Sequence, residues 1–136
     1  DAILGKRPPL RVLGIDYPTP DGTAIRDYIH VADLETAHIK ALQHLLEKQT
    51  SFSCNLGSSV GYSVREVMAA ARTVTGRDVP HTLEPRRPGD PPMLVAQPQR
   101  AAELLGLTMP HSVDIHRIIA DAWSWHMRGL SMGFAA

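Results

Sequence analysis

The chain has 136 residues, which is enough for one domain or for a piece of a larger one, and too few for two. Hydrophobic residues make up 43% of it and charged residues 21%, so a packed core is possible and wholesale disorder is excluded. Because Lys and Arg together number 14 and Asp and Glu also number 14, no overall positive field attracts nucleic acid or an anionic membrane. Any anion-binding site must therefore be local.

The cysteine count and the apolar runs bear on the compartment. A single cysteine, Cys54, excludes an intramolecular disulfide and a cysteine-based zinc site, and it fits a reducing compartment. No apolar run is long enough to cross a membrane, and the N-terminus has no signal-peptide pattern. We therefore expect a soluble, cytoplasmic protein. The first residue is Asp1 rather than Met, which suggests that translation begins further upstream.

The first third of the chain is expected to contain two extended segments and the start of a helix. Residues 10–13 predict a short strand, and the turn-rich residues 14–22 predict a loop. Residues 26–31 form a second extended run. Asp33 is placed to cap a helix that ends near Lys48, because the apolar residues of this segment recur at spacings of three and four.

The middle of the chain is expected to contain a strand, a helix and a further strand. Alternating apolar and polar side chains at residues 52–56 predict a short strand suited to a sheet edge. Ser63 and Glu66 have the spacing of a capping box, in which each side chain accepts a hydrogen bond from the backbone of the other residue. The helix that they open is expected to end at Gly76, and residues 79–83 predict another strand.

The last third is expected to contain two helices separated by a turn. Residues 99–105 predict a short helix that Gly106 ends. Ser112 is placed to open a last helix with one apolar face, and Gly129 to end it. Residues 130–136 are expected to form a frayed tail.

The order of these elements limits the fold class. Strands interleaved with helices place the chain in the α/β or α+β class. A complete dinucleotide-binding fold shows a Gly-rich turn after its first strand, and neither G-x-G-x-x-G nor G-x-x-x-x-G-K occurs here. The chain therefore lacks a cofactor motif of its own.

The strongest candidate for an anion site is the basic pair Arg86-Arg87, followed by Pro88, Gly89 and Asp90. Guanidinium groups have planar donor forks that suit a phosphate or a carboxylate, so the pair predicts a phosphate clamp. A solvated loop with surface ion pairs is the competing interpretation, because such pairs are common.

A second candidate is Arg26-Asp27-Tyr28, which follows the turn-rich loop. Arg26 is either held by Asp27 or aimed at a ligand, and the sequence does not decide between these two readings.

Other reactive residue types do not form a recognisable site. The sequence has seven histidines, but His38 and His44 are six positions apart and do not share one helix face, so no metal site is expected. Cys54 is expected to be a small buried hydrophobic residue, and no nucleophile elbow surrounds Ser58. Trp125, on the last helix, is a candidate to cover a groove.

Three segments carry a resemblance to a known family by their residues, order and spacing. They are Asp16-Tyr17-Pro18-Thr19-Pro20-Asp21-Gly22-Thr23, Arg26-Asp27-Tyr28-Ile29-His30-Val31 and Pro85-Arg86-Arg87-Pro88-Gly89-Asp90. From residue 1 to about residue 127, the chain resembles the C-terminal part of UDP-glucose 4-epimerase, in the extended short-chain dehydrogenase/reductase group. The resemblance implies an α/β, Rossmann-type fold whose N-terminal NAD-binding part is missing, with residues 1–129 as the UDP-sugar-binding portion.

The resemblance also implies an activity and a set of binding residues. The family interconverts UDP-glucose and UDP-galactose through an NAD-dependent 4-keto intermediate, and a fixed nucleotide anchor lets the hexose turn over. By this resemblance, Arg26 and Arg87 contact the diphosphate, Asp90 contacts the ribose hydroxyls, and the backbone of Val12 and Leu13 contacts the uracil. The implied supporting residues are Asp27, Tyr28 and Arg86.

The catalytic machinery of the family is expected to lie outside this chain. The family's catalytic tyrosine belongs to an N-terminal Y-x-x-x-K motif, and no tyrosine here has a lysine four positions on. No catalytic residue is therefore expected, and NAD enters only as the family's cofactor. The family commonly forms homodimers. Leu94 stands where some members place an aromatic residue near the nucleotide.

The leading hypothesis is that this chain is the UDP-anchoring portion of an epimerase and is inactive alone. A free-standing nucleotide-sugar-binding module and a fragment of a related nucleotide-sugar decarboxylase or dehydratase remain as alternatives. The helices at residues 33–48 and 112–128 are expected to expose apolar area, so the chain should be marginally stable.

Overall fold

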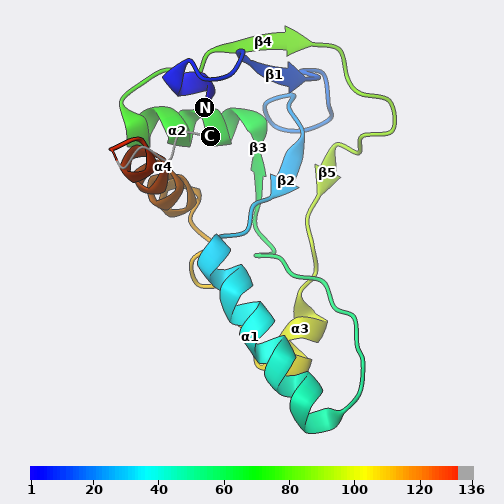
Figure 1. The fold of residues 1–136 in the computed structure, drawn as a ribbon. Coiled ribbons are helices and arrows are strands. Elements are labelled where there is room, and N and C mark those ends of the chain that lie inside the picture. Colours follow the sequence, from blue (N-terminus) through cyan, green and yellow to red (C-terminus); the bar gives the residue numbers. More distant parts are fainter. Residues whose placement is uncertain (132–136) are drawn as a thin grey trace.

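The computed structural model describes residues 1–131, and helices and strands alternate along them (Figure 1). The helices are the 3-10 helix η1 (Ala2–Leu4), α1 (Val31–Lys48), α2 (Val64–Thr75), α3 (Gln99–Leu105) and α4 (Ile115–Ser131). The strands are β1 (Leu10–Leu13), β2 (Ile25–Asp27), β3 (Gly61–Ser63), β4 (His81–Glu84) and β5 (Met93–Leu94). The α/β class expected from the sequence is confirmed.

The strands form two small sheets. β1 pairs with β4 in parallel, with Leu10 opposite His81. In the other sheet, of order β3-β2-β5, β2 is antiparallel to β3 and parallel to β5. The parallel pairings bring segments that are distant in sequence to one end of the molecule, where Figure 1 shows β1 and β4 above β2 and β5.

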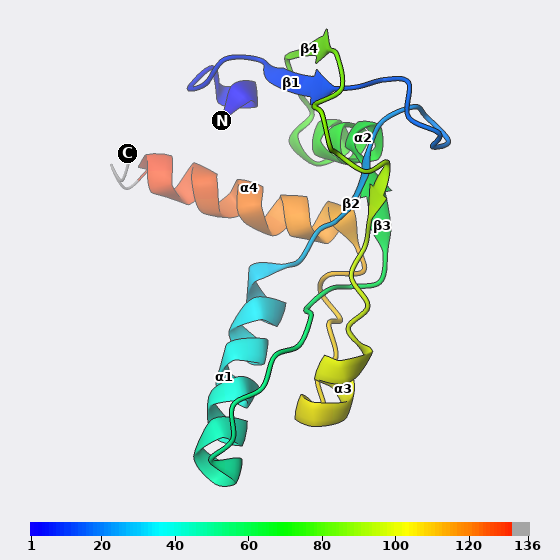
Figure 2. The same cartoon turned by 90° about the vertical axis from the view of Figure 1, so that its right-hand side faces the viewer.

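The helices pack in two pairs. α2 packs against α4, and α1 packs against α3. Ala37 of α1, Ala101 of α3 and Leu107 form a buried cluster, and the partly buried residues around it are Cys54, Leu56, Leu105 and Met109. In Figure 2, α1 and α4 begin close together and then diverge, so that each leaves the body of the molecule in its own direction.

Several elements match their sequence signals. β1 and α3 have the predicted bounds, and β4 starts two residues later than expected. The capping box of α2 is complete: Glu66 N–H donates to Ser63 Oγ at 3.0 Å, and Ser63 N–H donates to the Glu66 carboxylate at 2.7 Å. Gly76 ends α2 with a φ of 66°, in the left-handed region that glycine tolerates.

The predicted start of α1 was wrong. The second strand ends at Asp27 rather than continuing to residue 31, and the N-cap of α1 is His30 rather than Asp33. His30 Nδ1 accepts a hydrogen bond from Ala32 N–H at 3.0 Å. Asp33 lies within the first turn, where its buried carboxylate accepts hydrogen bonds from a distant loop instead. Local preference for Asp at an N-cap was overridden by this tertiary contact.

Residues 52–56 do not form the predicted strand. The alternation itself is correct, because Phe52, Cys54 and Leu56 are half-buried while Ser53 and Asn55 are exposed. The segment packs its apolar side chains beside α1 and α3, but it pairs with no strand among residues 1–131. A strand requires a ladder as well as a pattern, and only the pattern is local.

Both predicted ends of the last helix were wrong. α4 begins at Ile115, three residues after Ser112, because Ser112 donates its hydroxyl to Asp33 rather than capping the helix. The helix continues through Gly129 to Ser131, since a single glycine costs only about 1 kcal/mol in a helix. Of the tail predicted at residues 130–136, residues 132–136 lie outside the described part of the chain. None of the helices described is long and apolar enough to span a membrane.

Candidate functional site

Arg26, Arg87 and Asp90 converge although they come from different elements. Arg26 lies in β2, and because β2 pairs with β5, the loop that leads into β5 returns beside it. Arg87 Nε donates to Asp90 Oδ2 at 3.2 Å, and Arg26 Nη2 lies 4.0 Å from the same oxygen. Asp90 N–H donates to Arg87 O at 3.2 Å, and Gly89 between them has a φ of 83°, so the turn depends on glycine there. Two guanidinium groups therefore face one point at the protein surface.

Arg86 points away from this point. Its Nε donates to Asp16 Oδ1 at 2.6 Å, and its guanidinium carbon lies 4.4 Å from the centre of the Tyr17 ring. The hydrogen bond from Arg86 lowers the pKa of the Asp16 carboxyl, although partial burial opposes this. The two neighbouring arginines therefore do not form one clamp: Arg86 holds the 14–17 loop, while Arg87 faces Arg26 and Asp90.

Asp27 and Tyr28 support the same region. Asp27 does not bind Arg26; its carboxylate accepts from Ser58 N–H at 3.1 Å, Ser58 Oγ–H at 2.7 Å and Ala96 N–H at 3.1 Å. It thereby ties the loop before β3 and the segment after β5 to the end of β2. Tyr28 is half-buried. Burial raises the pKa of its phenol above the ordinary value, although the nearby Arg26 opposes this shift.

Among residues 1–131, the backbone of β1 pairs with a strand on one edge only, which is the edge that faces β4. Hydrogen bonds from Leu10 N–H to Pro80 O at 2.7 Å and from Gly14 N–H to Glu84 O at 2.8 Å flank its ladder with β4. Ladder bonds in a parallel pair recur at every second residue, so the backbone of Val12 also faces β4. The backbone groups of Leu13 point to the other edge, which pairs with no strand in the described residues. The side chain of Val12 is buried in the core.

Leu94 lies next to Arg26, because the two residues are partners in the β2–β5 ladder. Its side chain is 62% exposed, which is unusual for a leucine in a strand. The exposed Leu94 therefore contributes an apolar surface beside the guanidinium of Arg26.

A hydrogen-bonded network around Asp21 was not predicted from the sequence. Asp21 Oδ1 accepts from Thr23 N–H at 2.8 Å and Thr23 Oγ1–H at 2.7 Å, and Asp21 Oδ2 accepts from the Ser63 hydroxyl. The network joins the 14–23 loop to the N-cap of α2. Asp-Gly-Thr is a recognisable turn signal, but its partner Ser63 is 42 positions away and has no mark in the local pattern.

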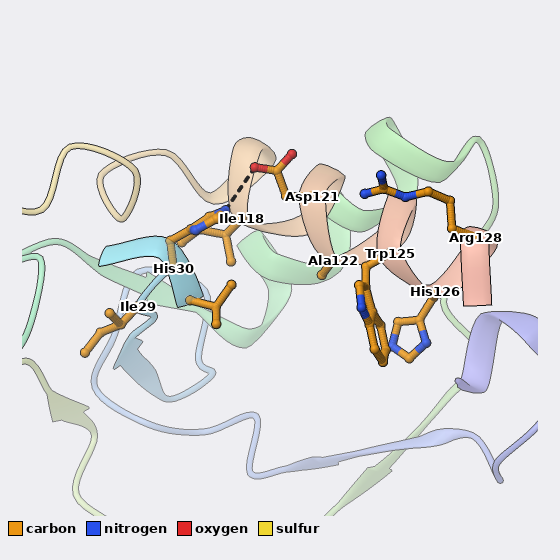
Figure 3. Close-up of a pocket in the computed structure, with 9 residues that line it drawn as sticks. Ile29, His30, Ile118, Asp121, Ala122, Trp125, His126 and Arg128 are labelled. Carbon is orange, nitrogen blue, oxygen red and sulfur yellow. Dashed lines mark hydrogen bonds and ion pairs between the residues drawn. The ribbon is translucent and has the colours of Figure 1, made fainter. Parts of the chain in front are cut away.

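A second missed network joins α1 to α4. Because His30 Nδ1 accepts from Ala32, its other ring nitrogen carries the proton, and this Nε2 donates to Asp121 Oδ2 at 3.0 Å. His30 N–H donates to Ser112 Oγ at 2.9 Å. These contacts hold the start of α1 against α4. Figure 3 shows the His30–Asp121 bond at one end of a hollow.

The candidate histidines and Cys54 make contacts with neighbouring residues of the fold. His38 Nδ1 lies 2.7 Å from Leu34 O, and the ring of His44 packs edge-on against Phe52. Cys54 is half-buried against the Ala37 cluster. Within residues 1–131, no three His, Cys, Asp or Glu side chains are grouped closely enough to hold a metal ion. Trp125 is 67% exposed and lines the hollow of Figure 3.

The described residues do not form a cradle for NAD. A dinucleotide-binding turn joins a strand directly to a helix through glycines. Here β1 ends at Leu13 and leads through Gly14 into a loop and β2, while β4 leads into the proline-rich loop before β5. Neither of these two turns joins a strand directly to a helix.

Comparisons with known proteins found a family model and several relatives that match this chain. Residues 2–57 match the NAD dependent epimerase/dehydratase family. UDP-glucose 4-epimerase from Lacticaseibacillus casei is 48% identical over 122 residues, which is 90% of this chain and 37% of the relative. The enzyme of the same name from Azospirillum brasilense is 51% identical over 124 residues, covering 91% of this chain and 35% of the relative.

Solved structures give the same result. The crystal structure of UDP-glucose-4-epimerase from Stenotrophomonas maltophila, with bound NAD and formylated UDP-arabinopyranose, superposes with a TM-score of 0.86 and 40% identity. The match covers 97% of this chain and 38% of that one. The chain thus spans a little over a third of the length of the proteins that it matches. Over nine-tenths or more of its length, this chain matches the C-terminal part of proteins named UDP-glucose 4-epimerase, and residues 1–131 have a partial extended short-chain dehydrogenase/reductase fold.

Proposed function

We propose that this chain is the nucleotide-anchoring part of a UDP-glucose 4-epimerase and that it holds the UDP group of the sugar nucleotide. The observation that carries the proposal is the convergence of Arg26, Arg87 and Asp90 at one point of the surface. Two guanidinium groups within 4.0 Å of one Asp90 oxygen are spaced to face the phosphates of a single diphosphate.

Each part of UDP finds a complementary group in this arrangement. The donor forks of Arg26 and Arg87 match phosphate oxygens, and the Asp90 carboxylate can accept hydrogen bonds from ribose hydroxyls. The backbone N–H and C=O of Leu13 can pair with the polar edge of uracil as a neighbouring strand would pair with them. The backbone of Val12 faces β4 rather than the free edge of β1. Val12 therefore supports β1 through its buried side chain. Tyr28, Asp27 and Arg86 hold these groups in place.

An anchor on the nucleotide suits a reaction that must present both faces of the hexose. If contacts to the diphosphate and the nucleoside provide the binding free energy, the sugar can turn over without the substrate dissociating. The whole protein would then interconvert UDP-glucose and UDP-galactose, with NAD bound outside this chain supplying the hydride chemistry. We extend the proposal to galactose metabolism, a cytoplasmic location and a homodimeric full-length protein, on the strength of the resemblance.

Titration of the chain with UDP tests the anchor. We expect saturable binding by calorimetry, which Arg87→Ala weakens by roughly 10- to 100-fold, because a charge-assisted hydrogen bond contributes about 1.5–3 kcal/mol. Arg72→Ala is the matched control, since Arg72 forms an exposed ion pair with Asp78 on the far end of α2. Equal affinity of the two variants for UDP, with unchanged circular dichroism, would remove Arg87 from the site.

The chain alone is expected to show no epimerase activity. Neither the Y-x-x-x-K motif nor a Gly-rich dinucleotide turn occurs in its sequence, so a general base at the hexose and a site for the hydride acceptor are both lacking. The measurement is conversion of UDP-galactose to UDP-glucose by the purified chain with added NAD. Turnover at the rate of a full-length relative would contradict the assignment of this chain to anchoring alone.

A further inference from the structure

Asp90 lies at the point that the guanidinium groups of Arg26 and Arg87 face. Its Oδ2 accepts a hydrogen bond from Arg87 Nε at 3.2 Å and lies 4.0 Å from Arg26 Nη2. The side chains of Arg26 and Asp90 are only 25% and 28% exposed, so water screens this pair incompletely. A carboxylate and a phosphate bind the same guanidinium donors. The chain therefore already holds one anionic group where the proposed function places a second.

Backbone hydrogen bonds keep Asp90 in this place. Its N–H donates to Arg87 O at 3.2 Å, across a turn of the loop. Two residues further on, Pro92 O accepts from Ile25 N–H at 2.9 Å, which ties the loop to β2. The Arg26 side chain is also held, because its Nη1 donates to Ile25 O at 2.7 Å. The position of the Asp90 carboxylate beside the guanidinium groups is therefore set by these bonds as well as by its own charge.

This carboxylate acts differently on two classes of anion. An inorganic phosphate or pyrophosphate must either displace it from the guanidinium groups or lie beside it, and in both cases the like charge opposes binding. A nucleoside diphosphate also carries ribose hydroxyls, which can donate to the carboxylate and replace the hydrogen bond that it loses. A group that repels the wrong ligand more than the right one raises specificity even where it lowers affinity.

We propose that Asp90 is a specificity-determining residue, which excludes inorganic phosphate and pyrophosphate from the anchor and admits nucleoside diphosphates. The inference rests on the proposed function for the position of the ribose. It goes beyond that function because it assigns Asp90 a repulsive role toward anions that lack a sugar. It predicts that removing the charge of Asp90 improves the binding of pyrophosphate without improving that of UDP.

Calorimetric titrations of the natural chain, Asp90→Asn and Asp78→Asn at one fixed ionic strength test this. Asp90→Asn keeps the shape of the side chain, removes its charge and leaves the backbone bond to Arg87 in place. Asp78→Asn changes the net charge equally, but Asp78 precedes β4 and pairs with Arg72. We expect Asp90→Asn to bind pyrophosphate about tenfold more tightly than the natural chain, because one like charge about 4 Å away has an effect of this order. Asp78→Asn should stay within about threefold of the natural chain.

UDP should show no such gain. Asp90→Asn is expected to bind it no more tightly than the natural chain does, because the weaker contact to the ribose offsets the lost repulsion. The ratio of the affinities for UDP and pyrophosphate should therefore fall at least about tenfold. This ratio would not move if Asp90 only supported the fold, because both ligands would then lose affinity together.

Two further titrations locate the effect. 2′,3′-Dideoxy-UDP keeps the uracil and the diphosphate but lacks both hydroxyls. The natural chain should bind it at least about tenfold more weakly than UDP, and Asp90→Asn should reduce this difference to less than about threefold. A double variant with Arg87→Ala and Asp90→Asn should lose most of the gain for pyrophosphate, because the gain arises at the guanidinium groups.

Three results would overturn the inference. One is a pyrophosphate affinity that Asp90→Asn leaves unchanged or lowers. Another is an equal gain for pyrophosphate and UDP, which would be a general effect of charge. The third is loss of the folded circular dichroism spectrum in both Asp90→Asn and Asp90→Ser, which would make Asp90 a structural residue. A gain for pyrophosphate in a chain that does not bind UDP would contradict the proposed function and support the exclusion of inorganic anions.

Discussion

At the scale of single residues, the most consequential side chain outside the site is Asp33. Its carboxylate is buried and accepts three hydrogen bonds from the turn before α4: from His111 N–H at 3.1 Å, Ser112 N–H at 2.8 Å and Ser112 Oγ–H at 2.6 Å. Ser112 Oγ in turn accepts from His30 N–H. Asp33 therefore fastens the first turn of α1 to the segment that leads into α4.

Replacing Asp33 shows how much this contact contributes. Asp33→Ala leaves buried donors without a partner, so the free energy of unfolding should fall by about 2–4 kcal/mol. Urea denaturation followed by circular dichroism measures the change. Glu35→Ala, on the exposed side of the same helix, is the control and should stay within about 0.5 kcal/mol of the natural chain. Similar midpoints for the two variants would show that Asp33 is not a structural link.

At the scale of elements, α2 is the helix whose ends are most completely determined by nearby residues. Ser63 and Glu66 satisfy each other's backbone groups at its start, and Gly76 adopts the left-handed conformation at its end. Ser63 also donates its hydroxyl to Asp21, which connects the helix to the loop after β1. The Ser63 side chain thus caps the helix and also binds a distant loop.

Ser63→Ala removes both functions of the cap. We expect the free energy of unfolding to fall by about 1–2 kcal/mol, because the Glu66 N–H loses its acceptor and Asp21 loses a donor. Thermal unfolding provides the measurement. Thr73→Ala alters an exposed hydroxyl on the same helix and should change stability by less than about 0.5 kcal/mol. A loss as large at Thr73 as at Ser63 would show that the effect is not specific to the cap.

At the scale of the whole molecule, carboxylates join segments that are distant in sequence. Asp16 contacts Arg86, Asp21 contacts Ser63, and Glu84 contacts Arg11. Hydrogen bonding lowers the pKa of the Asp16 and Glu84 carboxyls. For Asp21, burial by itself would raise the pKa, but the hydrogen bonds from Ser63 and Thr23 together lower it.

These lowered pKa values predict the direction of the pH dependence. When a carboxyl has a lower pKa in the folded state, its contribution to stability is present above its ordinary pKa of about 3.9–4.3 and is lost as the pH falls below it. The free energy of unfolding should therefore decrease from about pH 5 downward. Asp21→Asn should flatten this decrease, and the exposed Asp78→Asn is the control. Denaturation midpoints measured between pH 3 and pH 7 test the prediction, and identical slopes for the two variants would contradict it.

Features whose causes lie within a few residues of each other were predicted correctly from the sequence. The capping box of α2, the glycine that ends α3 and the strand at residues 10–13 all follow from local chemistry. The motif segments also predicted the similarity to UDP-glucose 4-epimerases that the comparisons found, because the order and spacing of residues can be read without any knowledge of contacts.

The tertiary structure decided the features whose partners are remote. Asp33 has the residue type of an N-cap, but Ser112, 79 positions away, turned it into a buried acceptor and moved the start of α4. Arg86 and Arg87 are adjacent and chemically alike, and only the position of Asp16 and Tyr17 sends one to the loop while the other faces Asp90. The short strands β3 and β5 have no periodicity of their own, since their two or three residues are held by pairing with β2. Local free-energy terms of about 1 kcal/mol set preferences, and long-range hydrogen bonds and packing of larger total size overrule them.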